Sequence, residues 1–517
     1  MEYENHWATS VSGSTVTITP PIGFPAFSTL ATPTVYRVSN PSVGDGLEDL
    51  SLDFGSSGDI NLAYTYASWI KGVRIVNAGS NGGISIFTVA NCLIANNYII
   101  QTIAEKSESM VPNTTGFDLY LNNIVQSEGI FSQSGGGGDV WAFNLLRDAY
   151  NNGGGGYVNN TISNHSSGYA MNLWEGNEFG DEQEDNVHGT SNLNTFFRNI
   201  IYGNDPPYRE TNNTFGLTWW GIARFENAIG NVIGGSWISN YKCTSSSCST
   251  ISSIVTVGNG NTGITDALSN TSAMLWGNYD TVTKAVRWCG NSSSPGWSTT
   301  CSNTSEVPTS LSGNAAPYEN PVPGSTTLPA SFFMSTTAHP SGGTGLSWWK
   351  VCTNYPTCST STTDSFPPIG PDVTGGNITG TNGFPNYQGY AYHIPAYIAW
   401  KNLPIDTSYQ SSYTISSSSW SSGTETLTVS SLPAGVLLSG EFQINNGGCA
   451  GTYMMTASTS TTISYAAASN PGSCTSGSFL FPDVRTFNET VYQADSDSSS
   501  GSTPAPPTNL QGTPAPQ

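Results

Sequence analysis

The sequence predicts an all-β protein, built mainly as a solenoid of stacked strands and followed by a small antiparallel β module. Its 517 residues include 57 glycines and are rich in Ser, Thr and Asn, a composition that favours strands joined by turns over long helices. A short asparagine motif recurs along residues 97–233. No 3.6-residue periodicity spans these segments, so a helical repeat fits poorly.

The repeated motif is an asparagine, one variable residue and one apolar residue. Successive copies are 26, 21, 16, 17, 22 and 32 residues apart and begin at Asn97, Asn123, Asn144, Asn160, Asn177, Asn199 and Asn231. A repeat of variable length is typical of a solenoid whose turns carry insertions. Because Asn tolerates left-handed turns and hydrogen-bonds in two directions, we expect these residues to form a ladder. The apolar residue two places on should point inward and stack at about 4.8 Å.

Several phrases carry a resemblance to a known family. They are residues 172–177 (NLWEGN), 188–191 (HGTS), 197–199 (FRN), 276–280 (WGNYD) and 370–375 (GPDVTG). Across roughly residues 45–400 the chain resembles the right-handed parallel β-helix of pectate-lyase-like proteins, and in particular secreted bacterial proteins with such repeats. The resemblance implies a right-handed parallel β-helix. It does not select a function, because this fold hosts lyases, hydrolases, esterases, adhesins and phage spikes.

The chain divides into four parts. Residues 1–44 form an N-terminal β segment or cap, because their alternation is broken by Pro. Residues 45–404 form the β-helix, with an irregular packing segment near its C-terminal end. Residues 405–482 alternate between turn signals and predict a small β-sandwich-like module. Residues 483–517 are expected to be a return strand followed by a disordered Pro/Ser-rich tail.

Charge and cysteine content limit the partners and the location. The net charge of −21 disfavours nucleic acid, and no apolar stretch approaches the roughly 20 residues that insert into a membrane. Eight cysteines pair as close neighbours and predict disulfides and a secreted, extracellular or cell-surface protein. The pairs are Cys243/Cys248, Cys289/Cys301, Cys352/Cys358 and Cys449/Cys474, with Cys92 left over.

The candidate catalytic residues concentrate in residues 164–205, in a chain only 9% charged. Glu175 lies two residues before a ladder asparagine, where the other copies have Ala95, Leu121, Ala142, Val158, Phe197 and Ile229. An inward-facing carboxyl at this position would have a raised pKa, which suits a general acid. The alternative is that this turn bends and Glu175 faces solvent.

The same stretch offers partners for Glu175. Arg198 could orient Glu175 or Glu178, bind a uronate or act as a base, or it could simply pair with the acid run. Asp185 lies three residues before His188, and His165 opens the preceding turn. A carboxylate beside a histidine can fix its tautomer for acid–base work. Either histidine alone is more often structural.

Other residues of this region are candidates for binding. Trp174, Trp219 and Trp220 could stack on sugar rings or cap the solenoid core. The acidic run that includes Asp181 and Glu182 could bind Ca²⁺, although a solvated acidic loop is the simpler interpretation.

These residues support two candidate functions. The first is a secreted carbohydrate-active protein that cleaves an extended polysaccharide, either by paired carboxylates (Glu175 with Asp185 or Glu178) or by elimination with a His or Arg base. The second is a non-catalytic adhesin, glycan-binding or filament-forming protein that self-associates end to end through the open ends of the solenoid. Convergence of Glu175, Asp185, His165 and His188 in one place would favour the first.

Overall fold

The computed structural model describes most of the chain. The described residues are 4–22, 34–55, 57–78, 82–102, 108–127, 129–149, 161–203, 214–235, 238–244, 252–258, 263–288, 326–334, 369–372, 394–430 and 441–487. Among them no helix is both long and apolar enough to cross a membrane.

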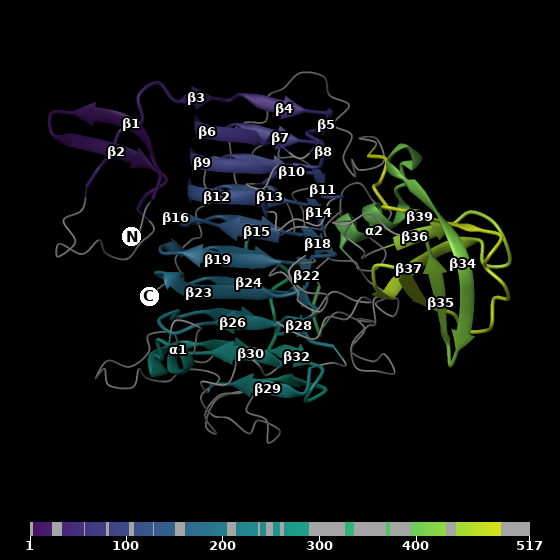
Figure 1. Ribbon diagram of the computed structural model, residues 1–517. Helices are drawn as coiled ribbons and strands as arrows, with labels where there is room; N and C mark the ends of the chain where they lie inside the picture. The colour runs from purple at the N-terminus through teal and green to yellow at the C-terminus, as the bar shows by residue number, and fades with distance from the viewer. Residues whose placement is uncertain are drawn as a thin grey trace.

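Three parallel β-sheets form the body of the molecule, and each turn of the chain contributes strands to all three in order (Figure 1). This arrangement confirms the predicted all-β fold with a parallel β-helix solenoid.

The twelve-stranded sheet consists of β3 (Ser42–Val43), β6 (Ile60–Tyr66), β9 (Ile84–Ala90), β12 (Glu108–Gly116), β15 (Gly129–Ser132), β19 (Ile162–Ser166), β23 (Glu182–His188), β26 (Leu217–Trp219), β30 (Ser253–Val257) and β29 (Asn240–Cys243), with β16 (Ser134–Gly137) and β20 (Tyr169–Ala170) beside its path. The nine-stranded sheet consists of β4 (Gly46–Glu48), β7 (Trp69–Lys71), β10 (Leu93–Ala95), β13 (Leu119–Leu121), β17 (Val140–Ala142), β21 (Leu173–Glu175), β24 (Thr195–Phe197), β27 (Asn227–Ile229) and β31 (Met274–Trp276). The ten-stranded sheet consists of β5 (Ser51–Asp53), β8 (Arg74–Val76), β11 (Tyr98–Ile100), β14 (Ile124–Gln126), β18 (Leu145–Arg147), β22 (Glu178–Phe179), β25 (Ile200–Ile201), β28 (Val232–Ile233), β32 (Asn278–Asp280) and the antiparallel β33 (Ala285–Arg287).

An asparagine ladder runs along the corner between the nine- and ten-stranded sheets. From Asn123 on, the Oδ1 atom of each ladder residue accepts hydrogen bonds from the backbone N–H and the Nδ2 of the asparagine one turn before it, at 2.8–3.1 Å, and the Oδ1 of Asn97 accepts the backbone N–H of Val73. Its members are Asn97, Asn123, Asn144, Asn177, Asn199, Asn231 and Asn278. The predicted ladder is therefore present among the described residues. Asn144 bonds directly to Asn177, and Asn278 extends the ladder by one turn. The predicted member Asn160 lies outside the described residues.

The left-handed residue at this corner is the one before each ladder asparagine. The residue at this place has a positive φ in successive turns, for example 55° at Asn96, 56° at Phe143 and 69° at Gly176. The expectation that the ladder asparagine itself takes this conformation was wrong. Its side chain caps the neighbouring turn, while the residue before it makes the bend.

A second ladder, which was not predicted, runs along the corner between the twelve- and nine-stranded sheets. Here a side-chain oxygen of each turn accepts the backbone N–H of the turn before it, at 2.7–3.0 Å. Its acceptors are Asp118, Asp139, Asn172, Asn194 and Glu226. Mixed Asp, Asn and Glu side chains perform the same capping, which is why no single-letter repeat reveals this corner.

Apolar and aromatic side chains fill the interior between the three sheets. The apolar residues two places after the ladder asparagines (Ile99, Val125, Leu146, Phe179, Ile201 and Ile233) are buried there, as predicted. Ring stacking continues through successive turns, with centroids 3.5 Å apart for Tyr120 and Trp141 and 4.9 Å apart for Trp141 and Trp174.

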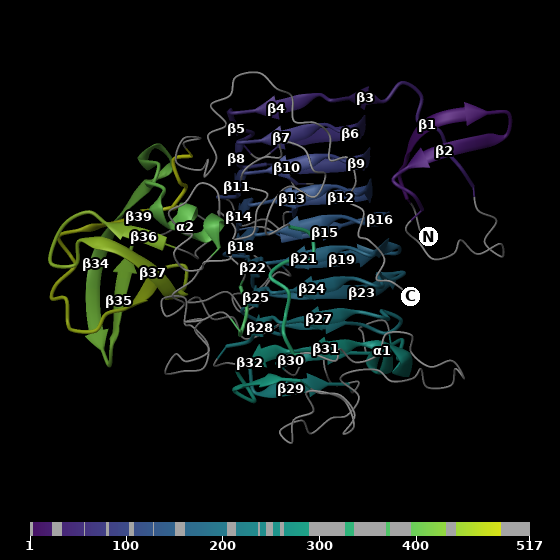
Figure 2. The same cartoon turned by 180° about the vertical axis from the view of Figure 1, so that it is seen from behind.

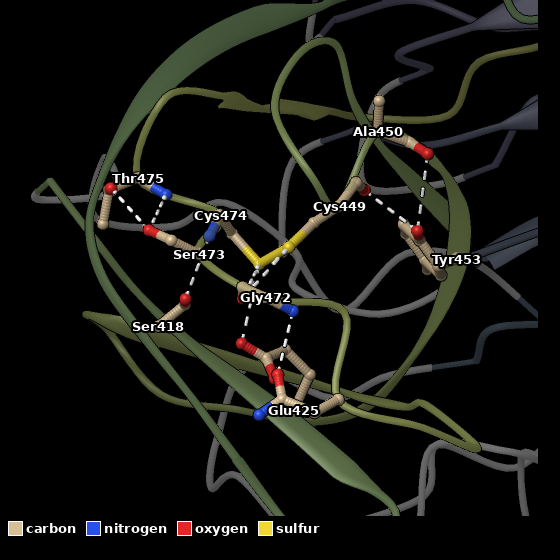
Figure 3. Close-up of a disulfide and its surroundings, with 10 residues drawn as sticks. Ser418, Glu425, Cys449, Ala450, Tyr453, Gly472, Ser473, Cys474 and Thr475 are labelled. Carbon is tan, nitrogen blue, oxygen red and sulfur yellow. Dashed lines mark hydrogen bonds between the residues drawn. A yellow bond between two sulfur atoms is a disulfide. The ribbon is translucent and has the colours of Figure 1, made fainter.

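A closed antiparallel barrel follows the solenoid, and it is not the two-sheet sandwich expected from the sequence. Its strand order is β34–β35–β38–β37–β36–β39, with β34 (Ser411–Ser421), β35 (Thr424–Val429), β36 (Glu441–Ile444), β37 (Gly451–Ser458), β38 (Thr462–Ala466) and β39 (Ser478–Phe481). The Cys449–Cys474 disulfide lies inside it, beside Glu425 (Figure 3). Cys243 is also disulfide-bonded, Cys92 is a buried free thiol, and the remaining cysteines lie outside the described residues.

The barrel docks on the ten-stranded sheet through a short helix and the segment that follows β39. Helix α2 (Pro395–Asn402) buries Trp400, whose Nε1 donates to Gln126 at 3.2 Å, and the guanidinium of Arg147 covers its ring at 3.5 Å. After the barrel, the backbone N–H of Arg485 donates to the hydroxyl of Tyr98. Figures 1 and 2 show the barrel on this side of the stack. The predicted tail, residues 488–517, lies outside the described residues.

A hairpin of β1 (Trp7–Ser12) and β2 (Thr15–Thr19) projects from the opposite side of the solenoid (Figure 2). Its base is anchored through the ring of Trp7 stacked on Tyr66 and the Asn5 side chain bonded to the carbonyl of Val89. The other helix of the described residues, α1 (Ala267–Ser272), is capped by the carboxylate of Asp266.

The asparagine ladder predicts a large effect from a single substitution. We expect Asn177→Ala to lower the free energy of unfolding by about 2 to 4 kcal/mol, because the backbone N–H and Nδ2 of Asn144 lose their buried acceptor. Denaturant titration followed by circular dichroism measures this. Asn61→Ala, at an exposed strand position, is the control, and equal losses in the two variants would contradict the ladder's role.

Candidate functional site

The candidate residues from the sequence separate into three environments. Glu175, Glu178 and Arg198 lie on the outer surface of the nine- and ten-stranded sheets, beneath covering segments. Asp181, Glu182, Trp174 and Trp219 are buried within the solenoid wall and interior. His165, Asp185 and His188 meet on the outer face of the twelve-stranded sheet. The four residues expected to converge therefore do so in part, because Glu175 belongs to another sheet.

Glu175 is buried, but it does not face the solenoid interior as predicted. It pairs in register with Ala142 and Phe197, while the neighbouring Trp174 points into the core, so Glu175 points outward. Residues 326–334 cover it, and its Oε2 accepts the backbone N–H of Phe332 at 2.8 Å. Burial raises its pKa to about 7, against the opposing effects of hydrogen bonds from Ser331 and Phe332 and the charge of Arg198. The carboxyl holds the covering segment in place.

Arg198 and Glu178 hold covering segments in the same way. The guanidinium of Arg198 pairs with both carboxylate oxygens of Asp372 at 2.7 and 2.8 Å, and it donates to the carbonyls of Pro329 and Ile369. Glu178 accepts the backbone N–H of Ile394 at 2.9 Å. Arg198 thus pairs neither with the acid run nor with Glu175, and its donors are directed at the covering segments.

The acidic run forms strand β23 and is not a solvated loop. Side chains of Glu182 and Glu184 point into the interior and approach Glu226, with Asn164 and Asn194 as amide donors. Burial raises the pKa of all three glutamates, and the charges of Glu184 and Asp181 raise that of Glu182 further. No lysine or arginine is among these contacts, so the cluster is accommodated by keeping protons.

Within the described residues, Asp181 and Glu182 belong to no group of three potential metal ligands. Both are fully buried, and the Oδ1 of Asp181 accepts the backbone N–H of Thr161 at 2.8 Å. Burial raises the pKa of Asp181 to about 8. Within the described residues, only Glu425, Cys449 and Cys474 bring three potential ligand atoms together, and both sulfur atoms are committed to the disulfide (Figure 3).

Two of the three candidate tryptophans are core residues. Trp174 stacks between Trp141 and Phe196, and Trp219 packs on Phe196 at the next turn. Their burial excludes stacking on a sugar at the surface. Trp220 directly follows β26 and is half-buried.

An accessible cluster of rings and one carboxylate lies on β15, β19 and β23. The Nδ1 atom of His165 is 2.5 Å from Oδ2 of Asp185, whose Oδ1 accepts the backbone N–H of Val187. The ring of His188 meets that of His165 edge-on at 4.8 Å, and Phe131 packs against the other side at 4.8 Å. Asp185 is buried, while His188 is exposed and His165 is partly exposed. We call these four residues the histidine cluster.

The histidine cluster has the parts of an acid–base pair. A carboxylate that accepts the Nδ1–H of His165 leaves the lone pair on Nε2, so this atom can accept a proton. The exposed ring of His188 adds a second titratable group at the same place. The rings also provide partly exposed aromatic surface for a ligand.

Two exposed aromatic residues on the same sheet were missed from the sequence. Tyr64 is 50% exposed and Phe87 is 37% exposed, and their rings meet edge-on at 5.3 Å. They lie on the neighbouring strands β6 and β9, where Phe87 pairs with Ala63, the residue before Tyr64. Only an alignment of turns on the twelve-stranded sheet, which the asparagine motif does not supply, would have brought them together.

The fold and this surface define a parallel β-helix protein with a docked C-terminal barrel. Neither a family model nor a curated protein sequence matches the chain. The residues of the chain itself are therefore the basis for assigning its function.

The buried carboxyls predict a stability that falls as pH rises. In the unfolded chain these groups have pKa values near 4, whereas burial raises the pKa to about 7 for Glu184 and about 8 for Asp181. Between these values the folded protein binds more protons than the unfolded one, so their contribution is complete below about pH 4 and is lost as pH rises through 7 to 8. We expect a melting temperature several degrees higher at pH 5 than at pH 8.5.

Glu184→Gln should reduce this difference, because the amide needs no proton to remain neutral. Scanning calorimetry at several pH values measures it, with the exposed Glu48→Gln as the control. An unchanged pH profile in the Glu184 variant would show that the cluster is not the source.

Glu175 predicts a local effect on the covering segment. We expect Glu175→Ala to speed hydrogen exchange at the backbone N–H of Phe332 at least tenfold, since this group loses its acceptor and about 1 to 3 kcal/mol of local stability. Glu175→Gln keeps an acceptor oxygen and should exchange more slowly than the alanine variant. Mass spectrometry of peptides containing residues 326–334 would detect the difference, and equal exchange in all three proteins would contradict this role.

Proposed function

We propose that this chain is an extracellular glycan-binding β-helix protein that holds an extended polysaccharide on the outer face of its twelve-stranded sheet. The observation that carries the proposal is the histidine cluster, where the rings of Phe131, His165 and His188 meet at an accessible surface. Aromatic faces pack on the C–H faces of sugars, and the polar ring atoms provide hydrogen bonds.

The fate of the other candidates supports binding over hydrolysis by paired carboxylates. Glu175 and Glu178 accept backbone N–H groups of covering segments, so neither is directed at an open surface with Asp185. We also propose that the protein is secreted and that it is related to pectate-lyase-like proteins. The disulfide of the barrel is consistent with an extracellular setting. End-to-end self-association stays a prediction.

Cleavage by elimination is the second candidate, and the 2.5 Å contact between His165 and Asp185 favours it. Nε2 of His165 would take the proton on the carbon next to a uronate carboxylate. The electron pair forms a C=C bond as the glycosidic C–O bond at the β position breaks, and the leaving oxygen takes a proton from water. The product is an unsaturated uronide that absorbs ultraviolet light.

Binding and turnover assays on a polysaccharide panel test both candidates. For binding, we expect retardation of the protein in gels containing its ligand, and loss of this retardation in Phe131→Ala and His165→Ala. Trp420→Ala removes a partly exposed ring on the barrel and serves as the matched control. Retention of full binding by both cluster variants would overturn the proposed site.

For cleavage, we expect ultraviolet-absorbing products that decrease about 10² to 10⁴-fold in His165→Ala, the range typical of a lost general base. Asp185→Asn should slow the reaction at saturating substrate. New reducing ends without ultraviolet absorption would point to hydrolysis. Binding without either product would support the non-catalytic binding function and contradict cleavage.

A further inference from the structure

A line of uncharged side chains crosses the outer face of the twelve-stranded sheet, one per turn. Phe87, Asn113 and Ser134 are direct partners in the parallel pairing. A backbone hydrogen bond from Gly135 to Ser167 continues the same line through one further turn, and in the turn after that Gly189 lies against Ser167 and ends it. All of its members are partly exposed. We call Phe87, Asn113, Ser134 and Ser167 the polar column.

The polar column begins at an aromatic pair and ends beside the histidine cluster. Tyr64 packs edge-on against Phe87 at its first turn. At the other end, Ser167 lies two residues after His165, and His188 pairs with Ser166 next to the column. Three turns separate Phe87 from Ser167, which corresponds to about 14 Å at the strand spacing of about 4.8 Å. The strand spacing of about 4.8 Å is comparable to the length of one pyranose residue in an extended chain.

The charges on these strands are unsuited to an anionic polymer. Strands β6, β9, β12, β15, β16, β19 and β23 contain no lysine or arginine. Carboxylates near the column include those of Asp59, which accepts from the Ser85 hydroxyl, and Asp185 in the histidine cluster. These charges disfavour a polyuronate, and with it the elimination candidate, whereas hydroxyl and amide groups can bond the hydroxyls of an uncharged sugar.

We propose that the polar column binds a neutral, extended glycan lying parallel to the solenoid axis, with Tyr64 and Phe87 as a terminal stacking site two turns from Phe131 and four turns from His188 of the histidine cluster. This inference rests on the proposed function and names its ligand class. It makes binding depend on chain length, because only a chain that spans these turns contacts both the aromatic pair and the two histidines of the cluster.

Affinity electrophoresis with defined probes tests the proposal. The neutral probes are hydroxyethylcellulose, xylan and galactomannan, and the anionic probes are polygalacturonate and alginate. We expect retardation by at least one neutral probe and by neither anionic probe. Tyr64→Ala and Phe87→Ala should each weaken the affinity for that neutral probe about tenfold, which corresponds to about 1.4 kcal/mol. Trp420→Ala should leave it unchanged, and melting temperatures confirm that each variant is folded.

Length dependence supplies the second measurement. Titration calorimetry with oligosaccharides from the same polymer should show affinity rising up to about five or six sugar residues in the native protein. In Phe87→Ala the affinity should stop rising at shorter lengths. Binding only to anionic probes, or neutral binding unaffected by Tyr64→Ala and Phe87→Ala, would overturn the polar column and leave a glycan site at the histidine cluster. Failure to bind any probe would overturn both proposals.

Discussion

The structure depends on how its two buried corners satisfy the backbone. Between sheets the chain turns, and the N–H groups at these turns lose the regular partners that a strand provides. Each turn solves this with a side-chain oxygen from the turn that follows: asparagine along one corner, and Asp, Asn or Glu along the other. A buried N–H without a partner is costly, so these bonds fix the register of the whole stack. The three sheets, the aromatic interior and the outer faces all follow from that register.

Once the register is fixed, the outer faces take different roles. The nine- and ten-stranded sheets are largely covered, and their charged residues serve as anchors: Glu175 and Arg198 hold segments that come from far along the chain. The ten-stranded sheet also carries the barrel through Trp400 and Arg485. The outer face of the twelve-stranded sheet keeps exposed rings and hydroxyls in neighbouring turns. The proposed ligand surface is therefore the face on which these exposed groups are aligned.

The solenoid could be predicted from the sequence because the asparagine corner repeats one residue type. The inward apolar positions followed directly, since they keep a constant distance from each ladder residue. The second corner was missed because Asp118, Asn172 and Glu226 perform one task with three residue types. The fold class of the C-terminal module was predicted, but closure into a barrel depends on pairing between β34 and β39, which are distant in sequence.

The candidate site was harder to predict, because a side chain in this fold can be buried either in the solenoid interior or beneath a covering segment on its outer surface. Periodicity identified Glu175 as a buried carboxyl, but it could not show that the cover is residues 326–334 instead of the core. The acid run looked solvated because charge is normally exposed, and only the structure shows Glu182 and Glu184 sharing the interior with Asn164. Asp185 was expected to lie beside His188, three residues further along the same strand, but its carboxylate bonds His165 of the turn before, because side chains of adjacent turns stack on the sheet.

The ladders also determine how such a chain can change size during evolution. Every ladder member presents the same acceptor to the turn before it, so a duplication or deletion from one ladder asparagine to the next, such as Asn97 to Asn123, recreates an equivalent junction. The molecule can therefore lengthen or shorten by whole coils, and its exposed sheet grows or shrinks in steps of about 4.8 Å. Descendants of one ancestor would then differ in how many monomers of a polymer they span, while the chemistry of each contact stays the same.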